Sequence, residues 1–424
     1  MPRRGSDADR PPLPRHAPPS TRGRTPRVLR GLAIGLAVVL VSTAAVAGFL
    51  VWDVFNRVGD GAVTLEGAPQ VDPPTLGAYP DDKAFSLLIV GTDECGPKAT
   101  ALFDERCAEA DGLSRNDVNL LVHVSAAPRN VTVVSLPRDL GVPVPECTRE
   151  DGSVASAMEK ASMNSLFEHA GLSCIAKTVS ELGDIPVEFA AKISFDGVMA
   201  VTDAIGGVEV CIAGDGIRDR HTGIDWPAGL RTVSGVEALQ FIRTRHGVGD
   251  ESDLARISNQ QQYMSRLAKK VLSEDTLTDI PKVLRLTNAI ADNIDPSDEL
   301  ADPLRLAQLA LALKDVNFSD FVFVQYPNVV DPFDDDKVVP DEEAAAALWD
   351  AVRAGRPLQL TGDVTTHRGV ELITPAPTAP ETPETPETES TPEASATPDA
   401  RATLPPEVSG QTLEQETCAV GNQR

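Results

Sequence analysis

The chain has 424 residues, of which 42% are hydrophobic, and its formal net charge at pH 7 is −25. The charge is unevenly distributed: residues 1–30 hold eight Arg and two Asp, a net of +6, which leaves −31 on the rest. This hydrophobic content is enough to bury a core, so disorder of the whole chain is excluded. The acidic part lacks the basic surface that nucleic-acid binding requires, so we expect no nucleic-acid partner.

An uncharged stretch follows the basic segment. Residues 31–52 carry no charge and, at about 1.5 Å per residue, are long enough to cross a bilayer. Because Arg-rich flanks stay in the cytoplasm, we expect 1–30 to be a disordered basic cytoplasmic segment and 31–52 a transmembrane helix. The predicted location is the cell membrane, single-pass, with the N-terminus cytoplasmic and the C-terminal domain extracytoplasmic. The alternative is a cleaved signal peptide, since Ala45-Val46-Ala47 fits the small-x-small cleavage pattern.

The rest of the chain divides by composition into three regions. Residues 53–80 contain four Pro and predict a linker, and residues 81–360 look globular. Residues 361–424 include Thr-Pro-Glu repeats, which are typical of an extended, charged spacer, so we expect a disordered tail there.

Short apolar runs alternate with helical periodicity inside the globular region, which favours an α/β (α+β) fold with three layers around one central sheet. The expected strands are 85–90, 118–124, 131–135, 187–191 and 321–324. The expected helices are 157–169, 174–182, 195–205, 236–242, 253–272, 303–313 and 341–352.

Six cysteines agree with an extracytoplasmic location, where disulfide bonds persist. Cys95 and Cys107 enclose a polar, loop-like stretch and are expected to pair, and Cys147 with Cys174 is the next candidate bridge. Six cysteines allow fifteen full connectivities, so other pairings remain open.

Charged residues stand at the ends of three expected strands. Asp93 follows the first strand, Arg115 and Asp117 precede the second, and Arg138 and Asp139 follow the third. The ends of buried strands are where a sheet presents side chains to a ligand crevice. We therefore take these five residues as the candidate catalytic group.

Further candidates follow the helix expected at 236–242. Arg243 and Arg245 stand two positions apart, and Arg256 and Gln260 share a face of the next helix, with Asn259 beside them. Guanidinium groups bind phosphate oxygens bidentately, and carboxylates hold Mg²⁺ together with substrate phosphates. The pattern predicts a phosphorylated ligand bound with Mg²⁺ or Mn²⁺.

Several strings together resemble the LytR-CpsA-Psr family of wall-assembly enzymes, in the form found in actinobacteria. The strings are LLIVGTD, SRND, SLPRDL, MNSLFEHAG, FDGVMAVTDAIGGVEV, AGLRTVSGVEALQFIRTRH and DLARISNQQQ, and the resemblance runs from about residue 85 to residue 270.

The resemblance implies an extracytoplasmic phosphotransferase with a three-layer αβα domain, a central mixed sheet and an apolar lipid pocket. Such enzymes move a glycopolymer from a polyprenyl-pyrophosphate carrier to peptidoglycan, or to another glycan acceptor, through a phosphodiester; arabinogalactan is one candidate polymer. The implied metal ligands are Asp93 and Asp117, and either of them could be the base, with Asp93 favoured.

The resemblance also assigns residues to the ligand. Arg115 and Arg138 match arginines that contact pyrophosphate, and Arg243, Arg245, Arg256, Asn259 and Gln260 are the implied substrate-binding residues. Met163, Leu166, Phe195, Val198, Met199, Ile242 and Ile257 are candidate lining residues of the lipid pocket, or members of an ordinary core.

Two features depart from the family pattern. Twenty-four positions separate Asp93 from Asp117, a longer gap than is common, and the insertion carries Cys95 and Cys107. Many relatives have a Lys where this chain has Ser162, and the nearest lysine is Lys160. We therefore expect a disulfide-linked loop at the edge of the site.

Three functions remain open at this level. They are the phosphotransferase, a hydrolase of the same lipid pyrophosphate, and a non-catalytic module that binds wall polymer. The retained Asp93, Asp117 and Arg138 argue against the module, and dependence of the product on an acceptor would separate the two enzymes.

Overall fold

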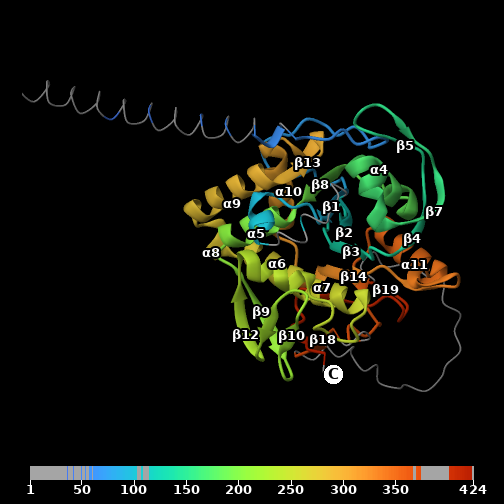
Figure 1. The fold of residues 1–424 in the computed structure, drawn as a ribbon. Coiled ribbons are helices and arrows are strands. Elements are labelled where there is room, and N and C mark those ends of the chain that lie inside the picture. The colour runs from blue at the N-terminus through green and yellow to red at the C-terminus, as the bar shows by residue number, and fades with distance from the viewer. Residues whose placement is uncertain are drawn as a thin grey trace, which may run out of the picture. The chain divides into compact units, whose positions relative to one another are not determined.

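The computed structural model describes residues 57–59, 61–102, 107, 114–365, 369–373 and 401–422, with isolated residues 36, 42, 49 and 53. The chain divides into two units, Met1–Asp53 and Val54–Arg424, and the fold below is that of the second (Figure 1). The predicted transmembrane helix lies almost wholly outside the described residues. Among the residues that are described, no helix combines the length and apolar character that a membrane span needs.

A mixed sheet of seven strands forms the centre of the described fold. Its order is β13-β8-β1-β2-β3-β14-β20, with β1 parallel to β8, β3 parallel to β14, and the other pairs antiparallel. The five expected strands are all in it. The bounds are β13 Ile294–Pro296, β8 Phe189–Ile193, β1 Phe85–Thr92, β2 Asn116–Val124, β3 Val131–Leu136, β14 Phe321–Gln325 and β20 Gly410–Thr412.

The register between β1 and β2 shifts at one point, beside the charged residues. Gly91 pairs with Val118, but Thr92 pairs with Asn116, so Asp117 is an extra residue on β2. Such a bulge re-aims the side chains around it and is common next to functional sites.

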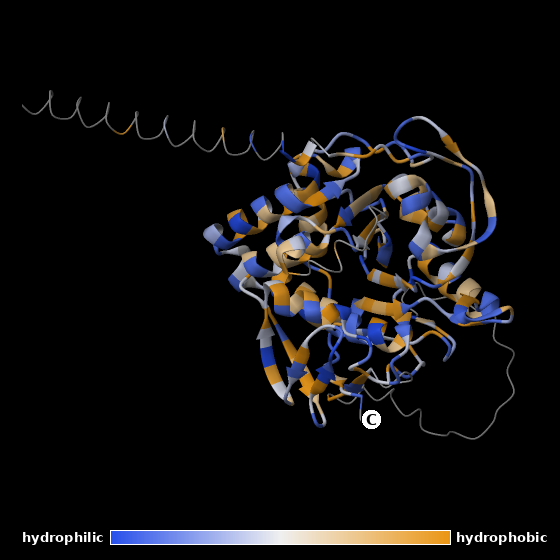
Figure 2. Ribbon diagram, viewed as in Figure 1, coloured by the Kyte–Doolittle hydropathy of each residue, from blue (hydrophilic) through white to orange (hydrophobic). Residues whose placement is uncertain are grey.

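Alternation along the strands gives the sheet two apolar faces. Leu88, Val90 and Leu121 lie on the face covered by α4 and α11, whereas Phe85 and Leu120 lie on the face covered by α7 and α10. In Figure 2, hydrophobic and hydrophilic residues alternate along the covering helices, as amphipathic packing requires. The three-layer arrangement predicted from the sequence is therefore present.

Most of the described helices were predicted, although those at 97–102, 274–277 and 280–293 were missed, and the predicted positions hold with one exception. Their bounds are α2 Pro97–Leu102, α4 Leu166–Gly183, α5 Phe195–Ala204, α6 Gly235–Arg243, α7 Asp253–Leu272, α8 Glu274–Leu277, α9 Ile280–Asn293, α10 Pro303–Leu313 and α11 Glu342–Arg353, with 3₁₀ turns at Met163–Ser165, Asp298–Leu300 and Phe318–Asp320.

The exception is the helix predicted at 157–169, which is wrong over its first half. Residues Met158–Ser162 form β7, which pairs with β4 (Gly141–Val144), because cross-strand pairing outweighs a weak local helical pattern. Helix α4 then covers the end of that predicted helix and the whole of the next one, predicted at 174–182. The chain bends within α4 at Gly171, which has a φ of +73°. Glycine adopts this conformation readily because it has no Cβ.

A second, smaller sheet has the order β12-β9-β21-β18. Its bounds are β12 Gly229–Val233, β9 Val208–Ala213, β21 Thr417–Val420 and β18 Val370–Leu372. Two-stranded pairs complete the described fold: β5 Cys147–Thr148 with β6 Val154–Ala155, β10 Ile217–Asp219 with β11 Ile224–Trp226, β15 Asn328–Asp331 with β16 Asp334–Pro340, and β17 Leu358–Gln359 with β19 Ala402–Thr403.

The prediction of a disordered tail over 361–424 is wrong for residues 370–372, which form β18, and for residues 401–422. Strand β20 extends the central sheet and β21 enters the second sheet, where the red end of the chain lies in Figure 1. Val408, Leu413 and Ala419 are fully buried. The prediction failed because it extended the composition of the Thr-Pro-Glu repeats to a stretch that has its own apolar residues.

The predicted linker 53–80 is also packed against the domain where it is described. Val63 donates its N–H to the carbonyl of Pro296, and the carboxylate of Glu66 pairs with Lys177 at 2.7 Å. Tyr79 is buried, with its ring 4.9 Å from that of Phe85. Residues 61–80 therefore belong to the fold.

Three disulfides connect the six cysteines. Cys95–Cys107 and Cys147–Cys174 confirm the two expected pairs, and Cys211–Cys418 joins β9 to β21 across 207 residues of sequence. A cross-link that closes so long a loop lowers the entropy of the unfolded chain most.

Glu188, next to β8, is a buried carboxyl that should make stability depend on pH. Its Oε2 accepts the N–H of Ser86 at 2.7 Å, and burial raises the pKa of Glu188 from 4.5 to about 7. A carboxyl group whose pKa is higher in the folded state than in the unfolded state stabilises the fold fully at pH values below its unfolded-state pKa. This stabilisation is lost as the pH rises through the folded-state pKa. Against Glu188→Gln, we expect the wild type to lose on the order of 3 kcal/mol of unfolding free energy between pH 4.5 and 8.

Urea denaturation at a series of pH values measures this difference. Glu181→Gln, at an exposed position on α4, is the matched control and should follow the wild type. Parallel stability curves for the wild type and Glu188→Gln would contradict the prediction.

Candidate active site

The end of the β1–β2 ladder fixes the orientation of Asp93. The N–H of Asp93 donates to the carbonyl of Arg115 at 3.1 Å, and the N–H of Arg115 donates back to Oδ1 of Asp93 at 2.7 Å. This reciprocal pair holds the carboxylate at the sheet edge, while the side chain of Arg115 is exposed.

Arg138, just past the end of β3, lies among three carboxylates. Its Nη1 is 3.1 Å from Oδ1 of Asp117, and its Nε is 3.3 Å from Asp139 and 3.4 Å from Asp253. Burial lowers the pKa of Arg138, but Asp117, Asp253 and Asp139 more than offset this, so the net shift is upward. The guanidinium is thus permanently charged and fixed in place.

The start of helix α7 brings the third carboxylate. Ser252 caps the helix by accepting the N–H of Ala255, and Asp253 follows in the first turn, where the helix dipole favours an anion. Asp253 pairs with Arg256 at 2.5 Å, and the side chains are only 11% and 8% exposed. Burial raises the pKa of Asp253 against the opposing pull of Arg256 and Arg138. Two buried, opposite charges therefore anchor α7 beside Arg138.

Asp253 and Lys337 belong to this cluster but were missed in the sequence. Asp253 stands at the head of the DLARISNQQQ string, and its spacing of three from Arg256 is the available signal. Lys337, on β16, donates to Oδ1 of Asp139 at 3.0 Å. The hydrogen bond from Lys337 and the charge of Arg138 overcome the effect of burial and lower the pKa of Asp139. No sequence pattern links Lys337 to the site, because the contact spans 198 residues.

Lys160, the nearest lysine to the position where relatives carry one, does not join the cluster. Its ammonium pairs with Asp331 at 2.5 Å, at the β15–β16 hairpin. Among the described lysines, Lys337 is the one that contacts a predicted catalytic residue.

Arg243 and Arg245 lie at the end of α6. The guanidinium of Arg243 stacks over the ring of Phe195 at 4.6 Å, and Nε of Arg245 donates to the carbonyl of Glu251 at 2.9 Å. The charge of Arg245 also acts on Asp253 and Arg256, which places it near the cluster.

Asn259 and Gln260 hold the end of α6 by their side chains. Nδ2 of Asn259 donates to the carbonyl of Phe241 at 3.0 Å, and Nε2 of Gln260 donates to that of Ile242 at 2.8 Å. The last carbonyls of a helix lack partners within the helix, so these amides satisfy them. Both donors are engaged by the backbone, an arrangement that positions Arg243.

An apolar cavity of about 320 Å³ lies between the sheet and the helices α5, α6, α7, α9 and α10. Val198 and Ile242, two of the expected lining residues, are in its wall. Met163 and Leu166 instead pack on the opposite face of the sheet with α4. The full lining is Val58, Leu87, Ile89, Gly91, Val118, Leu120, Ala191, Ile193, Val198, Val201, Thr202, Ile242, Tyr263, Met264, Leu267, Ile290, Ile294, Pro296, Leu300 and Leu306.

Residues of the cavity wall and charged residues of the site lie close together along the same strands. Gly91 lies two residues before Asp93, and Val118 directly follows Asp117. A smaller cavity of about 50 Å³ shares Val118 and Ile242 with it and extends to Gln260. An apolar wall and a charged cluster are therefore adjacent.

The disulfide Cys95–Cys107 lies in the insertion that follows Asp93. The insertion begins with α2, where the N–H groups of Lys98 and Ala99 donate to the carboxylate of Asp196 at 2.9 and 2.8 Å. This anchors the described part of the insertion to the start of α5, where the N–H of Phe195 donates to the carbonyl of Glu94, the residue after Asp93, at 3.4 Å.

The residues present fit a hard cation that is completed by ligand phosphates. Asp93 and Asp117 supply carboxylate oxygens from neighbouring strand ends, and Oδ2 of Asp117 accepts no hydrogen bond from the described part of the chain. Within that part, no group of three or more His, Cys, Asp or Glu is arranged to hold a metal. Mg²⁺ suits such a site, because it binds through one or two carboxylates plus phosphates and water.

Asp253→Asn should destabilise the fold strongly, because it leaves the guanidinium of Arg256 buried without its nearest opposite charge. We expect a loss of about 3 kcal/mol in the free energy of unfolding, measured by chemical denaturation. Asp225→Asn is the control, since it removes an exposed pair with Arg218 and should cost less than about 1 kcal/mol. Equal, small losses in both variants would show that the buried pair is dispensable.

Comparison with known proteins gives relatives from bacterial cell-wall synthesis. The cell wall biosynthesis protein LcpA of Corynebacterium glutamicum is 28% identical over 314 residues, which cover 69% of this chain and 59% of LcpA. The polyisoprenyl-teichoic acid–peptidoglycan teichoic acid transferase TagT of Bacillus subtilis is 25% identical over 295 residues, 68% of this chain and 83% of TagT. The crystal structure of B. subtilis TagV aligns with a TM-score of 0.48 at 20% identity, over 65% of this chain and 97% of TagV.

LcpA and TagT agree with a family-level match that takes in more than half of the chain. The matched residues are 57–352, which include the central sheet apart from β20 and all of the predicted site residues. The chain therefore belongs to the LytR_cpsA_psr family.

Proposed function

We propose that this chain is an extracytoplasmic phosphotransferase, which moves a glycopolymer from a polyprenyl-pyrophosphate carrier to peptidoglycan through a phosphodiester bond. The observation that carries the proposal is the adjacency of an apolar cavity to a cluster of Arg and Asp, with Gly91 and Val118 forming the link. A polyprenyl pyrophosphate has this same division into an apolar chain and a polyanionic head. The names of LcpA and TagT, a cell wall biosynthesis protein and a teichoic acid transferase, support the same reaction class.

The outer arginines supply the excess positive charge for a pyrophosphate. In the inner cluster three carboxylates and three cations balance, since Asp117, Asp139 and Asp253 face Arg138, Arg256 and Lys337. Arg115, Arg243 and Arg245 add three guanidinium groups around it, against the one further carboxylate of Asp93. Guanidinium groups suit this task because their planar forks bind phosphate oxygens bidentately.

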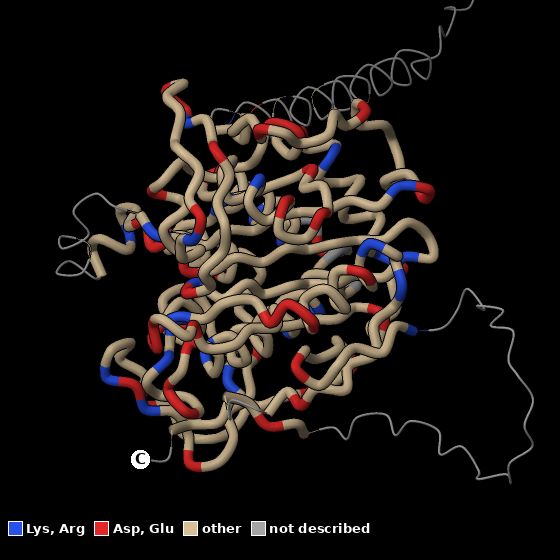
Figure 3. Tube along the Cα trace, turned by 90° about the vertical axis from the view of Figure 1, so that its right-hand side faces the viewer, with Lys and Arg blue, Asp and Glu red and all other residues tan. Residues whose placement is uncertain are grey.

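This positive region is local, in a domain that is acidic overall. Figure 3 shows Asp and Glu spread along the whole trace, interspersed with Lys and Arg. Because Asp and Glu outnumber Lys and Arg in the chain, a group of arginines at one place favours binding of a pyrophosphate there.

Asp93 and Asp117 would hold Mg²⁺ or Mn²⁺, which would neutralise charge on the pyrophosphate when bound. In the reaction, the hydroxyl oxygen of the acceptor attacks the phosphorus that bears the glycan. The bond from that phosphorus to the bridging oxygen breaks, and polyprenyl phosphate leaves with the electron pair. The hydroxyl proton passes to the carboxylate of Asp93. Arg138, fixed by its three carboxylates, stabilises the charge that develops on the phosphoryl oxygens.

The proposal includes the membrane location expected from residues 1–52. A lipid-linked donor is confined to the membrane surface, and a single span would keep the domain there. The three disulfides are consistent with an oxidising compartment outside the cytoplasm.

Arg138→Ala should abolish most of the transfer. We expect a loss of at least about 10²-fold in kcat, because a preorganised charge at the phosphoryl group is removed. The assay supplies residues 54–424 with Mg²⁺, a polyprenyl-pyrophosphate glycan and peptidoglycan fragments, and follows the phosphodiester product by mass spectrometry.

Arg401→Ala is the matched control, since it removes a surface guanidinium that pairs with Asp320 far along the sequence from the predicted site residues. Full activity of Arg138→Ala would refute the site. Glycan release that does not depend on the acceptor would instead support the hydrolase.

Filling the apolar cavity should weaken binding of long-chain donors selectively. Val201→Phe on α5 places a larger side chain in a cavity of about 320 Å³. We expect the affinity for a decaprenyl donor to fall by about 10-fold, with a smaller change for a geranyl donor, because each excluded CH₂ forfeits about 0.8 kcal/mol.

Val154→Phe, at an exposed position on β6, controls for added hydrophobicity. Equal effects on the two chain lengths would show that the cavity does not hold the lipid.

A further inference from the structure

The described C-terminal segment, residues 401–422, lies beyond the family match, which ends at residue 352. It is nevertheless held firmly in the fold. Strand β20 pairs with β14, β21 lies between β9 and β18, and Cys418 is bonded to Cys211. The segment therefore lies outside the matched residues but is linked covalently to β9 within them.

The end of this segment lies against residues 244–251, which we call the arginine loop because it carries Arg245. The N–H of Gly249 donates to the carbonyl of Val420 at 3.1 Å, and the N–H of Asn422 donates to the carbonyl of Gly247 at 2.9 Å. Val248 and Gly421 form a β-bridge between these two contacts. The loop is therefore paired with the C-terminal segment along its backbone.

The side chain of Asn422 reaches the residue that orients Arg245. Its Nδ2 donates to Oε1 of Glu251 and also contacts the carbonyl of His246 at 3.4 Å. Glu251 has a φ of +67°, a left-handed conformation that a residue with a Cβ rarely adopts. Its carbonyl accepts Nε of Arg245 at 2.9 Å. The C-terminal contact thus helps to hold a strained backbone that aims the guanidinium.

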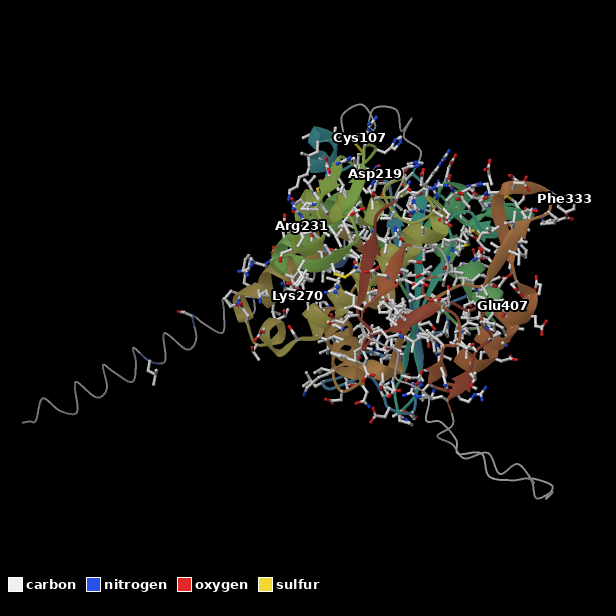
Figure 4. The ribbon with its side chains drawn as sticks, turned by 90° about the horizontal axis from the view of Figure 1, so that it is seen from below. Cys107, Asp219, Arg231, Lys270, Phe333 and Glu407 are labelled. Atoms are coloured by element: carbon white, nitrogen blue, oxygen red, sulfur yellow. A yellow bond between two sulfur atoms is a disulfide. The ribbon has the colours of Figure 1, made fainter. Side chains whose placement is uncertain are left out.

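The other side of the loop is fixed by the β10–β11 hairpin. The carboxylate of Asp219, labelled in Figure 4, accepts the hydroxyl of Thr244 at 2.6 Å and the N–H of Arg245 at 3.2 Å. Asp219 fixes the backbone at Arg245. Asn422 instead contacts Glu251, whose carbonyl accepts Nε of the Arg245 side chain. The two contacts have separate roles.

We infer that Asn422 is a positioning residue, which acts through Glu251 to orient Arg245 for the donor pyrophosphate. The disulfide Cys211–Cys418 keeps Asn422 in reach, since only three residues separate Asn422 from Cys418. The inference rests on the proposed function, because the pyrophosphate is the ligand that Arg245 would bind.

A double-mutant cycle tests it, with geranyl pyrophosphate and Mg²⁺ as the probe and calorimetry as the readout. Asn422→Ala should weaken binding by about 10-fold, which is the loss of one charge-assisted contact. In an Arg245→Ala background the same change should have no further effect, because two residues that act as one unit are not additive. Asn317→Ala, which removes an exposed amide, should bind like the wild type in both backgrounds.

Hydrogen exchange supplies a readout that does not depend on the ligand. Amides of residues 244–251 should exchange faster in Asn422→Ala, and in a chain that ends at Val420, with exchange in β1 and β2 unchanged. The inference would be overturned, with the proposed function left standing, if hydrogen exchange in the loop were unchanged. The same would follow if Asn422→Ala weakened binding by the same factor with and without Arg245. A wild-type chain that exchanges as expected but binds no geranyl pyrophosphate would overturn the proposed function and, with it, the role of Arg245.

Discussion

The guanidinium of Arg138 is surrounded by three carboxylates, and this contact requires β2, β3 and α7 to keep fixed relative positions. Asp117 comes from a bulge in β2, Asp139 follows Arg138 itself, and Asp253 begins α7. Partly buried charges are tolerated only when their partners are in place, so the surrounding packing is tightly constrained. The position of α7 in turn fixes the end of α6, through Asn259 and Gln260, and with it Arg243.

Charge and apolar surface are joined on one sheet. The face under α7 and α10 supplies the cavity, and the ends of the same strands supply Asp93 and Asp117. Strand alternation explains this closeness, because neighbouring residues of β2 face in different directions and Val118 of the cavity wall directly follows Asp117. A ligand with a long apolar chain and a charged head matches such a boundary better than a small polar ligand does.

The C-terminal segment adds a constraint from outside the matched domain. It completes two sheets, is bonded to β9, and lies against the loop that carries Arg245. Its contacts with that loop are made by backbone groups and by one short side chain, Asn422. Composition carries no trace of this role, because the acidic Thr-Pro-Glu stretch that precedes it dominates the end of the sequence.

The sequence by itself determined five of the seven strands of the central sheet, most of the helices, the three-layer class, two disulfides and the strand-end residues Asp93, Asp117 and Arg138. These follow from local periodicity and from motifs in which the residues are close in the chain. The tertiary structure alone decided that Asp253 and Lys337 join Arg138, that Lys160 does not, and that residues 401–422 return to pair with β14 and β9. The physical reason is distance along the chain: these contacts join residues separated by 86 to 207 positions, where no periodicity or spacing connects the partners.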